Sequence, residues 1–464
     1  MYKKKEKIES KLDMKQISLR LRSEFNDLKR TPSSVSKELN FPKKKIDSLL
    51  SGDFNYTDLF KFLNLMTGFY PINISDLIIT KKDTKNGMLF FKSKESKKSS
   101  RVFSRKGKDK KFSAYYEYRD TAKSNLSHFY PEWIEIKRFV DDDDAYNPDV
   151  IYNNGHFLHQ INLFVGPVNF YYEIDNKKYC MKMNTGDSSY ISPFIKHTFT
   201  KREKNTLAYI VAVTTGSGLK RNQNEFRRFG NNFLQKNILT IKKNFNFFTH
   251  SLKQAQKNEI ISDIKLSKML GAKIIKKIEN EKNFNDITLS EIEKVANSVN
   301  VSVSELLANY QNDGKVINKF FNEDEYIPFP DKTNFSYKVY RIAKSNNFFN
   351  LKGFLINIRS NRPPKLKLEF SLNLYVFNYG ENDLCIDWQY KDKFYKSNLK
   401  KGDSIYIEPF IKFSFSSLSK NSWVYLVTSE TGVDTETKKE LSSIHESIRL
   451  IQDENQWFHG KKGE

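Results

Sequence analysis

The chain lacks the residue types and the segments that define several common classes of protein. Its 464 residues include only two cysteines, Cys180 and Cys385, which excludes a disulfide scaffold and a zinc ribbon with cysteine ligands. It has no run of about 18 apolar residues that would form a transmembrane helix, and its charged start, MYKKKEKIESKLDMK, leads into no apolar stretch of a signal peptide. We therefore expect a cytoplasmic protein, and the length predicts about three globular domains.

Acidic residues are also in short supply, because 78 Lys and Arg residues outnumber 55 Asp and Glu residues and leave a formal charge of +23. An excess of this size is often the sign of a nucleic-acid partner. Here the lysines are spread over the whole chain together with many Asn, Ile and Phe residues, a bias that an AT-rich genome produces without selection for binding. The densest basic stretch, residues 92–111, is also rich in serine, which favours a solvated linker over a phosphate-binding arm. Charge alone therefore assigns no partner.

An internal repeat organises the chain. Pairs of similar segments occur in the same order, with offsets that differ only by short insertions or deletions. They are NISDLI at 73–78 with VSVSELL at 301–307, AKSN at 122–125 with AKSN at 343–346, and GDSSYISPFIKHTF at 186–199 with GDSIYIEPFIKFSF at 402–415. This arrangement indicates a tandem duplication, in which each copy has a front half and a back half.

The front half of each copy is expected to be helical. In the first copy the segments LRSEFNDLKR, PSSVSKELN and FPKKKIDSLLSGD are short and amphipathic, and they are separated by Pro, Asn and Gly residues that stop or cap helices. The second copy repeats this pattern in SDIKLSKMLGAKIIKKIENEKN. Short helices with such breaks are typical of a helix-turn-helix module.

The back half of each copy is expected to form β-strands. The segments HQINLFVGPVNFYYEI, KYCMKM, SSYISPF and LAYIVAVTT alternate apolar and polar residues, are rich in β-branched and aromatic types, and are separated by the turn sequences DNKK and NTGD. Strands of this length and spacing close into a sandwich or barrel. A GD turn followed by an apolar strand, a proline and a histidine resembles the second half of a cupin motif, which implies a jelly-roll β-barrel.

Together the halves predict an α+β protein that duplicates a helix-turn-helix module and a cupin barrel in tandem, a bicupin. After the second barrel, TETKKELSSIHESIRLIQDENQW at 435–457 has the pattern of a final helix. The expected divisions are helical module 1 (1–95), a metal-binding barrel 1 (96–230), helical module 2 (231–315), a barrel 2 without metal (316–432) and a C-terminal helix (433–464).

Histidine supplies the candidate metal ligands. In a jelly-roll barrel such ligands come from antiparallel strands that face the lumen; His156 and Gln160 precede or open the strand INLFVG, and His197 ends the strand after the GD turn. Four residues of extended strand span about 13 Å, too far for two ligands of one ion, so the sequence NNGHFLHQ has to bend. The Asn-Asn-Gly ahead of His156 suits a bend. His159 has the opposite parity to Gln160 and is expected to face away.

Single histidines at barrel ends are more often ordinary polar residues than ligands, but a contrast between the copies favours ligation in the first. Phe413 occupies the position of His197 in the second copy, and residues 366–372 hold no histidine where His156 would fall. Barrel 1 is therefore the predicted metal site. Two imidazoles favour a borderline metal, and open coordination positions favour redox-active Fe(II) over structural zinc.

The residues quoted above resemble those of a known family. YNNGHFLHQINLFVG, GDSSYISPFIKHTF, the helical module ahead of them and the duplication are together similar to the phosphonate-oxidising cupins, which are non-haem iron enzymes. Most of that family holds Fe(II) with two histidines and one carboxylate. The resemblance implies His156, Gln160 and His197 as the ligands here. Other members have their carboxylate at the position of Gln160 or of Ile191, and a glutamine with two histidines marks those that release methylphosphonate.

The resemblance also implies residues that bind the substrate. Asn153, three residues before the first ligand, and Tyr118, in the strand YYEY, would hydrogen-bond the phosphonate group. The phosphonate arginine of the family, eight residues before that tyrosine, falls on Lys110 in this chain. Arg101 and Arg105 are the alternatives for this contact.

A lysine of the helical module is implied as a catalytic residue. The lysine that the family carries just before the turn to its second helix matches Lys29 in LKRTPSSVSKEL. In the family this lysine reaches the active site of a neighbouring subunit, which implies a homo-oligomer. From composition alone Lys29 is instead a lysine at a helix C-terminus, where the helix dipole favours it.

The implied reaction is the Fe(II)- and O2-dependent cleavage of the C–C bond of 2-hydroxyethylphosphonate to methylphosphonate and bicarbonate or CO2. An alternative within the family is a dioxygenase that converts the same substrate to hydroxymethylphosphonate and formate, and only Gln160 and Ile191 separate the two. An alternative of another class is a cupin-fused helix-turn-helix regulator whose Lys43, Lys44 and Lys45 meet DNA phosphates. A recognition helix normally carries Arg, Asn or Gln toward base edges, so a nucleic-acid partner is not expected. Without a long apolar run, a membrane partner is not expected either.

Overall fold

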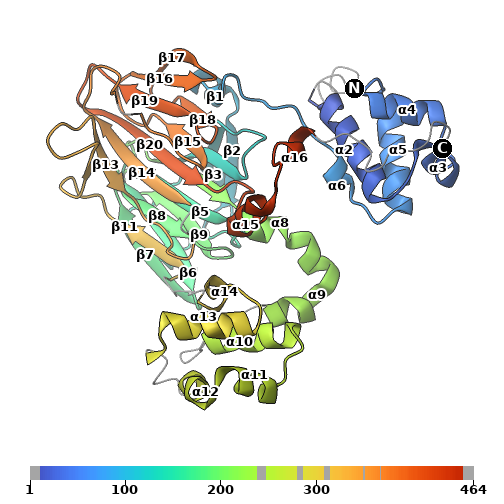
Figure 1. Ribbon diagram of the computed structural model, residues 1–464. Helices are drawn as coiled ribbons and strands as arrows, with labels where there is room; N and C mark the ends of the chain where they lie inside the picture. Colours follow the sequence, from blue (N-terminus) through green and yellow to red (C-terminus); the bar gives the residue numbers. More distant parts are fainter. Residues whose placement is uncertain are drawn as a thin grey trace.

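The structure is a computed structural model that describes residues 11–237, 247–279, 286–307, 314–348, 351–365 and 367–452. It confirms a mixed α+β protein, in which helical modules and two β-sandwiches alternate along the chain (Figure 1). In the part of the chain that the structure describes, no helix has both the length and the apolar character of a membrane span.

The N-terminal helical module packs short helices around a small apolar core. Its helices are α2 (Met14–Asp27), α3 (Pro32–Glu38), α4 (Lys43–Ser51), α5 (Tyr56–Phe69) and α6 (Ile74–Leu77). Asp13 and Asn55 accept hydrogen bonds from the first turns of α2 and α5, and Gly52, with a φ of 84°, ends α4 in the left-handed conformation. The breaks between helices therefore follow local capping chemistry, while buried side chains such as Leu21 and Phe62 hold the module together.

The first β-sandwich consists of β2 (Arg101–Lys106), β3 (Phe112–Asp120), β4 (Phe129–Ile136), β5 (His159–Val165), β6 (Val168–Ile174), β7 (Lys177–Met183), β8 (Ser188–Ile191), β9 (Lys196–Lys201), β10 (Tyr209–Thr215) and β11 (Val316–Lys319). A seven-stranded sheet in the order β11-β8-β5-β10-β4-β3-β2 faces a three-stranded sheet in the order β7-β6-β9. Apolar side chains from both sheets, including Phe164 and Phe170, fill the space between them.

The second β-sandwich repeats this plan. Its strands are β1 (Met88–Phe91), β12 (Ile327–Phe329), β13 (Tyr337–Arg341), β14 (Lys352–Ile358), β15 (Asn373–Phe377), β16 (Leu384–Tyr390), β17 (Lys393–Leu399), β18 (Ser404–Ile407), β19 (Lys412–Ser416) and β20 (Ser422–Ser429). The seven-stranded sheet has the order β1-β18-β15-β20-β14-β13-β12, and the three-stranded sheet has the order β17-β16-β19. The duplication that the sequence indicates is therefore visible in the strand order.

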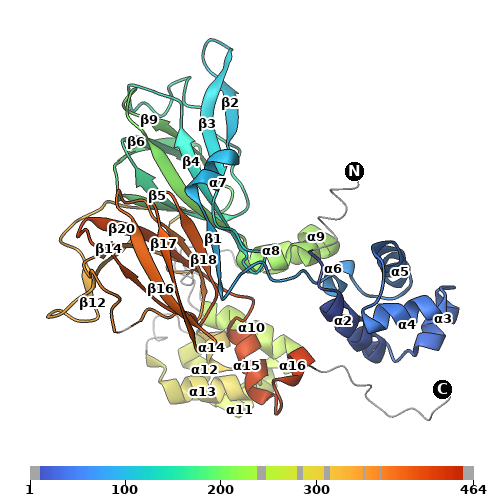
Figure 2. The same ribbon diagram turned by 90° about the horizontal axis from the view of Figure 1, so that it is seen from above.

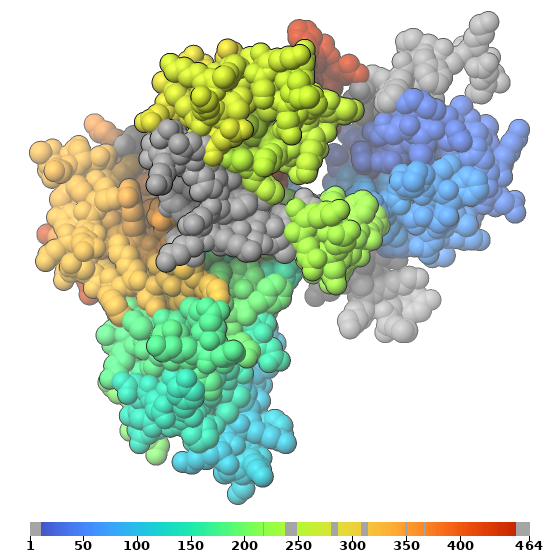
Figure 3. Space-filling view, turned by 90° about the horizontal axis from the view of Figure 1, so that it is seen from below, coloured from blue at the N-terminus to red at the C-terminus, as the bar shows by residue number. Residues whose placement is uncertain are grey.

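Further helices follow the first sandwich and the last strand. They are α8 (Ser217–Arg221), α9 (Gln223–Asn237), α10 (Phe247–Asn258), α11 (Asp263–Leu270), α12 (Ala272–Glu279), α13 (Leu289–Ser298), α14 (Val303–Leu306), α15 (Thr435–Ser443) and α16 (Arg449–Gln452). Arg228 of α9 donates to Asn73 at 2.9 Å, so this helix touches the N-terminal module (Figures 2 and 3). The sequence predicts one helix over 435–457, whereas the described residues there form two short helices, and residues 453–464 lie outside the described part.

The basic stretch at 92–111 is not a linker, and that prediction is wrong. Its residues form α7 (Ser93–Lys98) and the edge strand β2. The guanidinium of Arg105 lies 4.6 Å and 5.1 Å from the ring centroids of Tyr115 and Tyr116, which attach β2 to β3 through cation–π contacts. The composition of this stretch does not predict a strand, because the aromatic residues that its cations contact come later in the chain.

Each sandwich receives one strand from the other half of the chain. β1 precedes the first sandwich but pairs antiparallel with β18 of the second, and β11 precedes the second sandwich but pairs antiparallel with β8 of the first. The expected divisions assign residues 88–91 to helical module 1 and residues 316–319 to barrel 2, so both strands lie elsewhere than expected. Local hydrophobic pattern identifies a strand, but only the tertiary topology determines its partner.

In both sandwiches the repeated GD turn is hydrogen-bonded to the segment that follows the exchanged strand. Asp187 in the first GD turn accepts a hydrogen bond from the backbone N–H of Phe321 at 2.7 Å, just after β11. Asp403 in the second GD turn accepts one from the backbone N–H of Ser93 at 2.8 Å, just after β1. Each GD turn therefore anchors the segment that follows the exchanged strand.

The serine after each GD turn binds the AKSN motif of the other copy. Ser188 accepts a hydrogen bond from the backbone N–H of Ala343 at 2.9 Å, and Ser404 accepts one from that of Ala122 at 2.8 Å. All four residues are buried. Two of the three repeated motifs thus meet across the boundary between the sandwiches.

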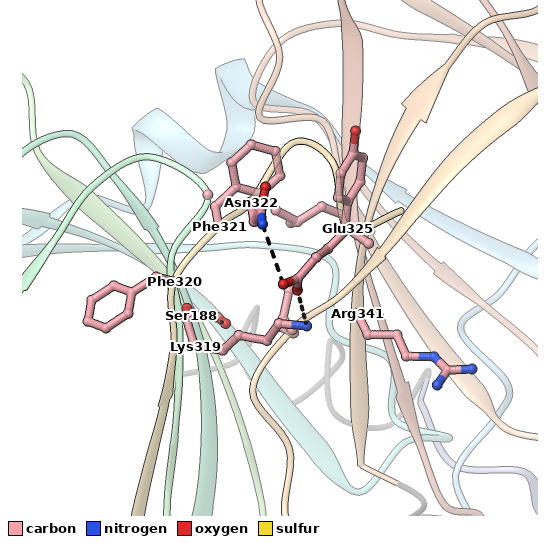
Figure 4. A pocket seen from close by; sticks show the side chains of 11 residues that line it. Ser188, Lys319, Phe320, Phe321, Asn322, Glu325 and Arg341 are labelled. Atoms are coloured by element: carbon pink, nitrogen blue, oxygen red, sulfur yellow. Dashed lines mark hydrogen bonds and ion pairs between the residues drawn. The ribbon is translucent and has the colours of Figure 1, made fainter. Parts of the chain in front are cut away.

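The boundary itself is an apolar core with one small pocket at its edge. Side chains such as Ile161 of β5 and Leu355 of β14 pack together between the two seven-stranded sheets. In the pocket, the Nζ of Lys319 lies 3.8 Å from a carboxylate oxygen of Glu325, and Asn322 donates to the same carboxylate at 3.4 Å (Figure 4). None of the candidate metal ligands lines this pocket.

We expect Asp403→Ala to lower the free energy of unfolding by about 1–3 kcal/mol, because its buried carboxylate accepts from the backbone N–H groups of Ser93 and Lys400, which the variant leaves unsatisfied. Urea unfolding followed by tryptophan fluorescence measures this loss. Asp383→Ala removes an exposed carboxylate from the same sandwich and serves as the control. Equal losses in the two variants would contradict an anchoring role for Asp403.

Candidate active site

The candidate site is formed where the chain bends sharply before β5. Gly155 has a φ of 74°, and a Cβ at this position would lie 2.6 Å from the backbone of Phe194. The N–H of Phe194 donates to the carbonyl of His156 at 2.7 Å, so the two segments are in direct contact. Only glycine combines this backbone conformation with this close approach. The expected bend is present, and it carries His156 back over the end of β9.

His197 on β9 is held as a neutral imidazole with one nitrogen directed to the site. Its Nδ1–H donates to the carbonyl of Ile195 at 2.8 Å, so Nε2 is the nitrogen that carries a lone pair, and it accepts from Asn153. The Nδ2 of Asn153 lies 3.1 Å from this Nε2, and the Oδ1 of Asn153 accepts from the backbone N–H of His197 at 2.9 Å. Burial is the main cause that lowers the pKa of His197 to about 4, so the ring is uncharged near neutral pH.

His156 and Gln160 meet beside this imidazole. The Nε2 of His156 lies 2.8 Å from the Oε1 of Gln160, and the ring centroids of His156 and His197 are 5.2 Å apart. Gln160 is only 5% exposed, and its Nε2 donates to the Oδ1 of Asn162 at 2.7 Å. The Nδ1 of His156 is buried and has no hydrogen-bond partner among the described residues. The three side chains therefore bring two imidazoles and one amide oxygen together inside the first sandwich.

This donor set suits a divalent transition metal. Imidazole nitrogens and an amide oxygen are neutral ligands, and the hydrogen bond from His197 to Ile195 is the kind of outer contact that orients a ligating histidine. The described residues contain no cluster of three His, Cys, Asp or Glu side chains that could hold a metal. The residues thus fit an ion held by two histidines and one glutamine, and an ion bound here would keep its full positive charge.

The second sandwich has the same backbone contacts but apolar residues at the two histidine positions. The N–H of Phe410 donates to the carbonyl of Phe370 at 2.7 Å, as Phe194 does to His156 in the first sandwich. Phe370 therefore stands where His156 would be, and it stacks at 6.3 Å on Phe413, the counterpart of His197. Phe370 lies within residues 366–372, the stretch that holds no histidine in the sequence. Residue 366 is outside the described part of the chain.

The glutamine position is apolar as well. Leu374 of β15 lies opposite Ile407 of β18, just as Gln160 of β5 lies opposite Ile191 of β8. Leu374 is 1% exposed, so it contributes to a closed core. Residues 160 and 191 are therefore neighbours on adjacent strands.

Next to the imidazoles the first sandwich carries Arg105 and several tyrosines. The guanidinium of Arg105 donates to the Oγ1 of Thr198 at 3.2 Å and to the carbonyl of Ile151. Its positive charge adds to the effect of burial in lowering the pKa of His197, whereas at Tyr118 it opposes the larger effect of burial. Burial is the largest effect on Tyr118 and raises the pKa of its phenol to about 12, so this side chain remains a hydrogen-bond donor.

The structure does not bring Lys110 to this place. Lys110 is exposed and has a φ of 59° in the turn between β2 and β3. The two strands fold back from that turn, which returns Arg105 to the side of Tyr115 and Tyr116. The alternative Arg101 pairs with Asp120 at 2.9 Å. Counting residues back from Tyr118 ignores the turn between β2 and β3. Because of this turn, Arg105 and not Lys110 lies beside the tyrosines.

Lys29 also lies away from the site within one chain. It is an exposed residue with a φ of 56° at the end of α2, and its Nζ donates to the carbonyl of Asn26 at 3.1 Å. The N-terminal module stands apart from β5, β6 and β9 in both ribbon views (Figures 1 and 2). Any contact between this lysine and the imidazoles would come from another copy of the chain.

His159 faces away from the site, as expected from its parity. Its Nδ1 lies 2.7 Å from the hydroxyl of Tyr190, and its ring stacks on Phe348 at 4.2 Å. Both contacts lie in the core between the two sandwiches.

The comparisons with known proteins converge on one group. No family model matches the chain. It is 32% identical to methylphosphonate synthase of Nitrosopumilus maritimus (strain SCM1), over 98% of this chain and 99% of that protein. Among solved structures it is similar to hydroxyethylphosphonate dioxygenase (HEPD) of Streptomyces albus with 2-hydroxyethylphosphonate and Fe(II) bound, at a TM-score of 0.85 and 28% identity over 96% of this chain and 98% of the other. A point variant of hydroxyethylphosphonate dioxygenase shares the fold at a TM-score of 0.69 and 16% identity, over 95% of this chain and 99% of that one.

We expect Gly155→Ala to lower the free energy of unfolding by about 1–3 kcal/mol, because the new Cβ meets the backbone of Phe194 in a left-handed conformation. Gly68→Ala is the matched control, since a Cβ there meets no atom within 4 Å and lies inside α5, where alanine favours the helix. Urea unfolding of the two variants measures the difference. A stability of Gly155→Ala equal to that of Gly68→Ala would show that the turn is not constrained as described.

Proposed function

The chain belongs to the methylphosphonate synthase family, and we propose that it cleaves the C–C bond of 2-hydroxyethylphosphonate with Fe(II) and O2, releasing methylphosphonate and bicarbonate or CO2. The observation that carries this proposal is the neutral donor set of His156, Gln160 and His197 in a chain that matches its relative from end to end. The reaction balances without an outside reductant, since the substrate supplies all four electrons that O2 accepts.

The proposed architecture is a bicupin in which each barrel follows a helix-turn-helix module, with metal only in the first barrel. The mixed sandwiches and the short capped helices support it. The apolar replacements at Phe370, Leu374 and Phe413 support a second barrel without metal. In this proposal the second barrel serves as a scaffold for the first.

We propose that His156, Gln160 and His197 hold the iron. When bound, Fe(II) would supply the redox chemistry that activates O2. The neutral side chains leave the charge of the ion uncompensated, so the negatively charged oxygens of the substrate provide the balance, and the site favours substrate over an uncharged competitor. Burial around Gln160 and His197 excludes bulk water, which protects a reactive fragment of the substrate from quenching by solvent.

The proposed phosphonate contacts are Asn153, Tyr118 and Arg105. Asn153 already lies 3.1 Å from the metal-directed nitrogen of His197, so a donor of this side chain is within reach of a ligand bound there. Tyr118 remains protonated and donates, while Arg105 offers a charge-assisted bond in place of Lys110. Lys29 would complete this set from a neighbouring subunit, which makes the active enzyme a homo-oligomer.

The second candidate is the sister reaction, conversion of the same substrate to hydroxymethylphosphonate and formate. The similarity to the Streptomyces albus HEPD structure favours it. The amide of Gln160 and the aliphatic Ile191 opposite it favour the first reading, because neither offers a carboxylate. For the DNA-binding alternative, the support is weakened by α4 itself, where Lys43 pairs with Asp47 at 3.0 Å and Lys45 pairs with Asp58 at 2.6 Å.

Phosphorus NMR of the product mixture tests the proposal. The purified chain, reconstituted with Fe(II) and supplied with 2-hydroxyethylphosphonate under air, is expected to give a methylphosphonate resonance. A hydroxymethylphosphonate resonance would support the sister reaction instead, and unchanged substrate with iron bound would contradict both. His197→Ala is expected to lose both iron and turnover, whereas His445→Ala, which changes an exposed histidine, is expected to keep both.

Lys29→Gln is expected to abolish turnover while leaving the iron content at the wild-type level, because a neutral side chain of similar length cannot form the charge-assisted bond to the substrate. Lys37→Gln changes an exposed lysine of the neighbouring helix α3 and is the matched control. Turnover by phosphorus NMR and iron by a chelator assay separate the two effects. Wild-type turnover in Lys29→Gln would contradict the proposed role.

A further inference from the structure

Gln160 is the one proposed ligand whose orientation matters chemically. A carboxylate has two equivalent oxygens and binds a metal whichever way it is turned. An amide binds through its oxygen only, because the nitrogen lone pair is delocalised into the carbonyl. A glutamine in a ligand position is therefore productive in one of two orientations that have almost the same shape, and some neighbour has to select between them.

A buried polar pair lies directly behind this amide. The Nε2 of Gln160 donates to the Oδ1 of Asn162 at 2.7 Å, and the Nδ2 of Asn162 donates to the Oγ of Ser189 at 3.0 Å. Asn162 and Ser189 are both 0% exposed, so water cannot replace either of them. The pair links β5 to β8, where the two residues are direct cross-strand partners.

We propose that Asn162 and Ser189 are positioning residues that turn the oxygen of the Gln160 amide toward the metal site. The inference rests on the proposed function and assigns how its glutamine is held. In the opposite orientation of Gln160, its oxygen would face the Oδ1 of Asn162, and two buried acceptors would oppose each other. In the structure the Nδ2 of Asn162 is bonded to the Oγ of Ser189, so Asn162 presents its oxygen to Gln160.

The second sandwich provides an internal comparison. At the place of Asn162 it has Val376, and opposite that residue it has Ile405 at the place of Ser189. Both are 0% exposed. There the ligand position is Leu374, which has no orientation to select. The polar pair thus occurs in the copy that has an amide at the ligand position and is replaced by apolar residues in the copy that does not.

Titration with Co(II), whose visible absorption reports the coordination of the ion, tests the proposal without turnover. Asn162→Val introduces the residue of the second sandwich and removes the acceptor, and we expect it to weaken Co(II) binding by about 10–100-fold and to shift the absorption bands. Asn162→Asp keeps an acceptor for Gln160 at the same place, and we expect it to bind Co(II) at least as tightly as the wild type. Ser189→Ala is expected to fall between the two, since it frees only the far end of the pair.

Asn169→Val is the matched control. Asn169 is 1% exposed and donates to the carbonyl of Asp142 at 2.9 Å. It lies on β6, on the face of the sheet that points away from the candidate site. It should lose comparable stability in urea unfolding and leave the Co(II) spectrum unchanged. Wild-type binding and spectrum in folded Asn162→Val would overturn the inference, as would an Asn162→Asp variant that fails as Asn162→Val does. Failure of the wild-type chain to bind Co(II) would instead count against the metal site itself and so against the proposed function.

Discussion

The reciprocal exchange of β1 and β11 is the constraint on which the rest of this structure depends. β8 lies between the exchanged strand β11 and β5, the strand that carries Gln160. The sheet that positions the proposed ligand is therefore completed by a segment from the second copy. β11 pairs with the backbone groups of β8, and β1 with those of β18, so each sandwich takes one strand of its larger sheet from the other copy.

This dependence gives a physical reason for retaining a second sandwich whose own lumen is apolar. The GD turns and the AKSN motifs hold the boundary in place through buried bonds to backbone N–H groups, at Asp187, Ser188, Asp403 and Ser404. Those bonds need the particular side-chain acceptors, so they preserve the motifs in both copies. The ligand positions of the second copy need no such acceptors. Apolar side chains fill the space there and form part of the buried core.

The candidate site combines burial with electrical neutrality. His197 is uncharged because its environment is dry, and Gln160 supplies an oxygen without a charge. The positive charge of a metal in such a site would be balanced by the ligand that binds to it. Such a centre therefore favours an anionic substrate. Arg105, held by Thr198 and by two tyrosine rings, is the proposed partner of the anionic group of the substrate.

The amino-acid sequence by itself determined the α+β class, the duplication, the bend before His156 and the opposite facing of His159. These depend on local pattern, since capping, turn chemistry and strand parity are set by neighbours along the chain. The contrast between the copies indicates His156 and His197, the resemblance adds Gln160 as a ligand, and the structure brings these three together.

Only the tertiary structure decided which strands pair, which cation reaches the tyrosines and what lies behind Gln160. β1 and β11 cross to the other sandwich, Arg105 rather than Lys110 returns from the hairpin, and Asn162 meets Ser189 across two strands. Each of these is a contact between residues distant in the chain. Such contacts are selected by the free energy of the whole packed core, which local sequence pattern does not determine.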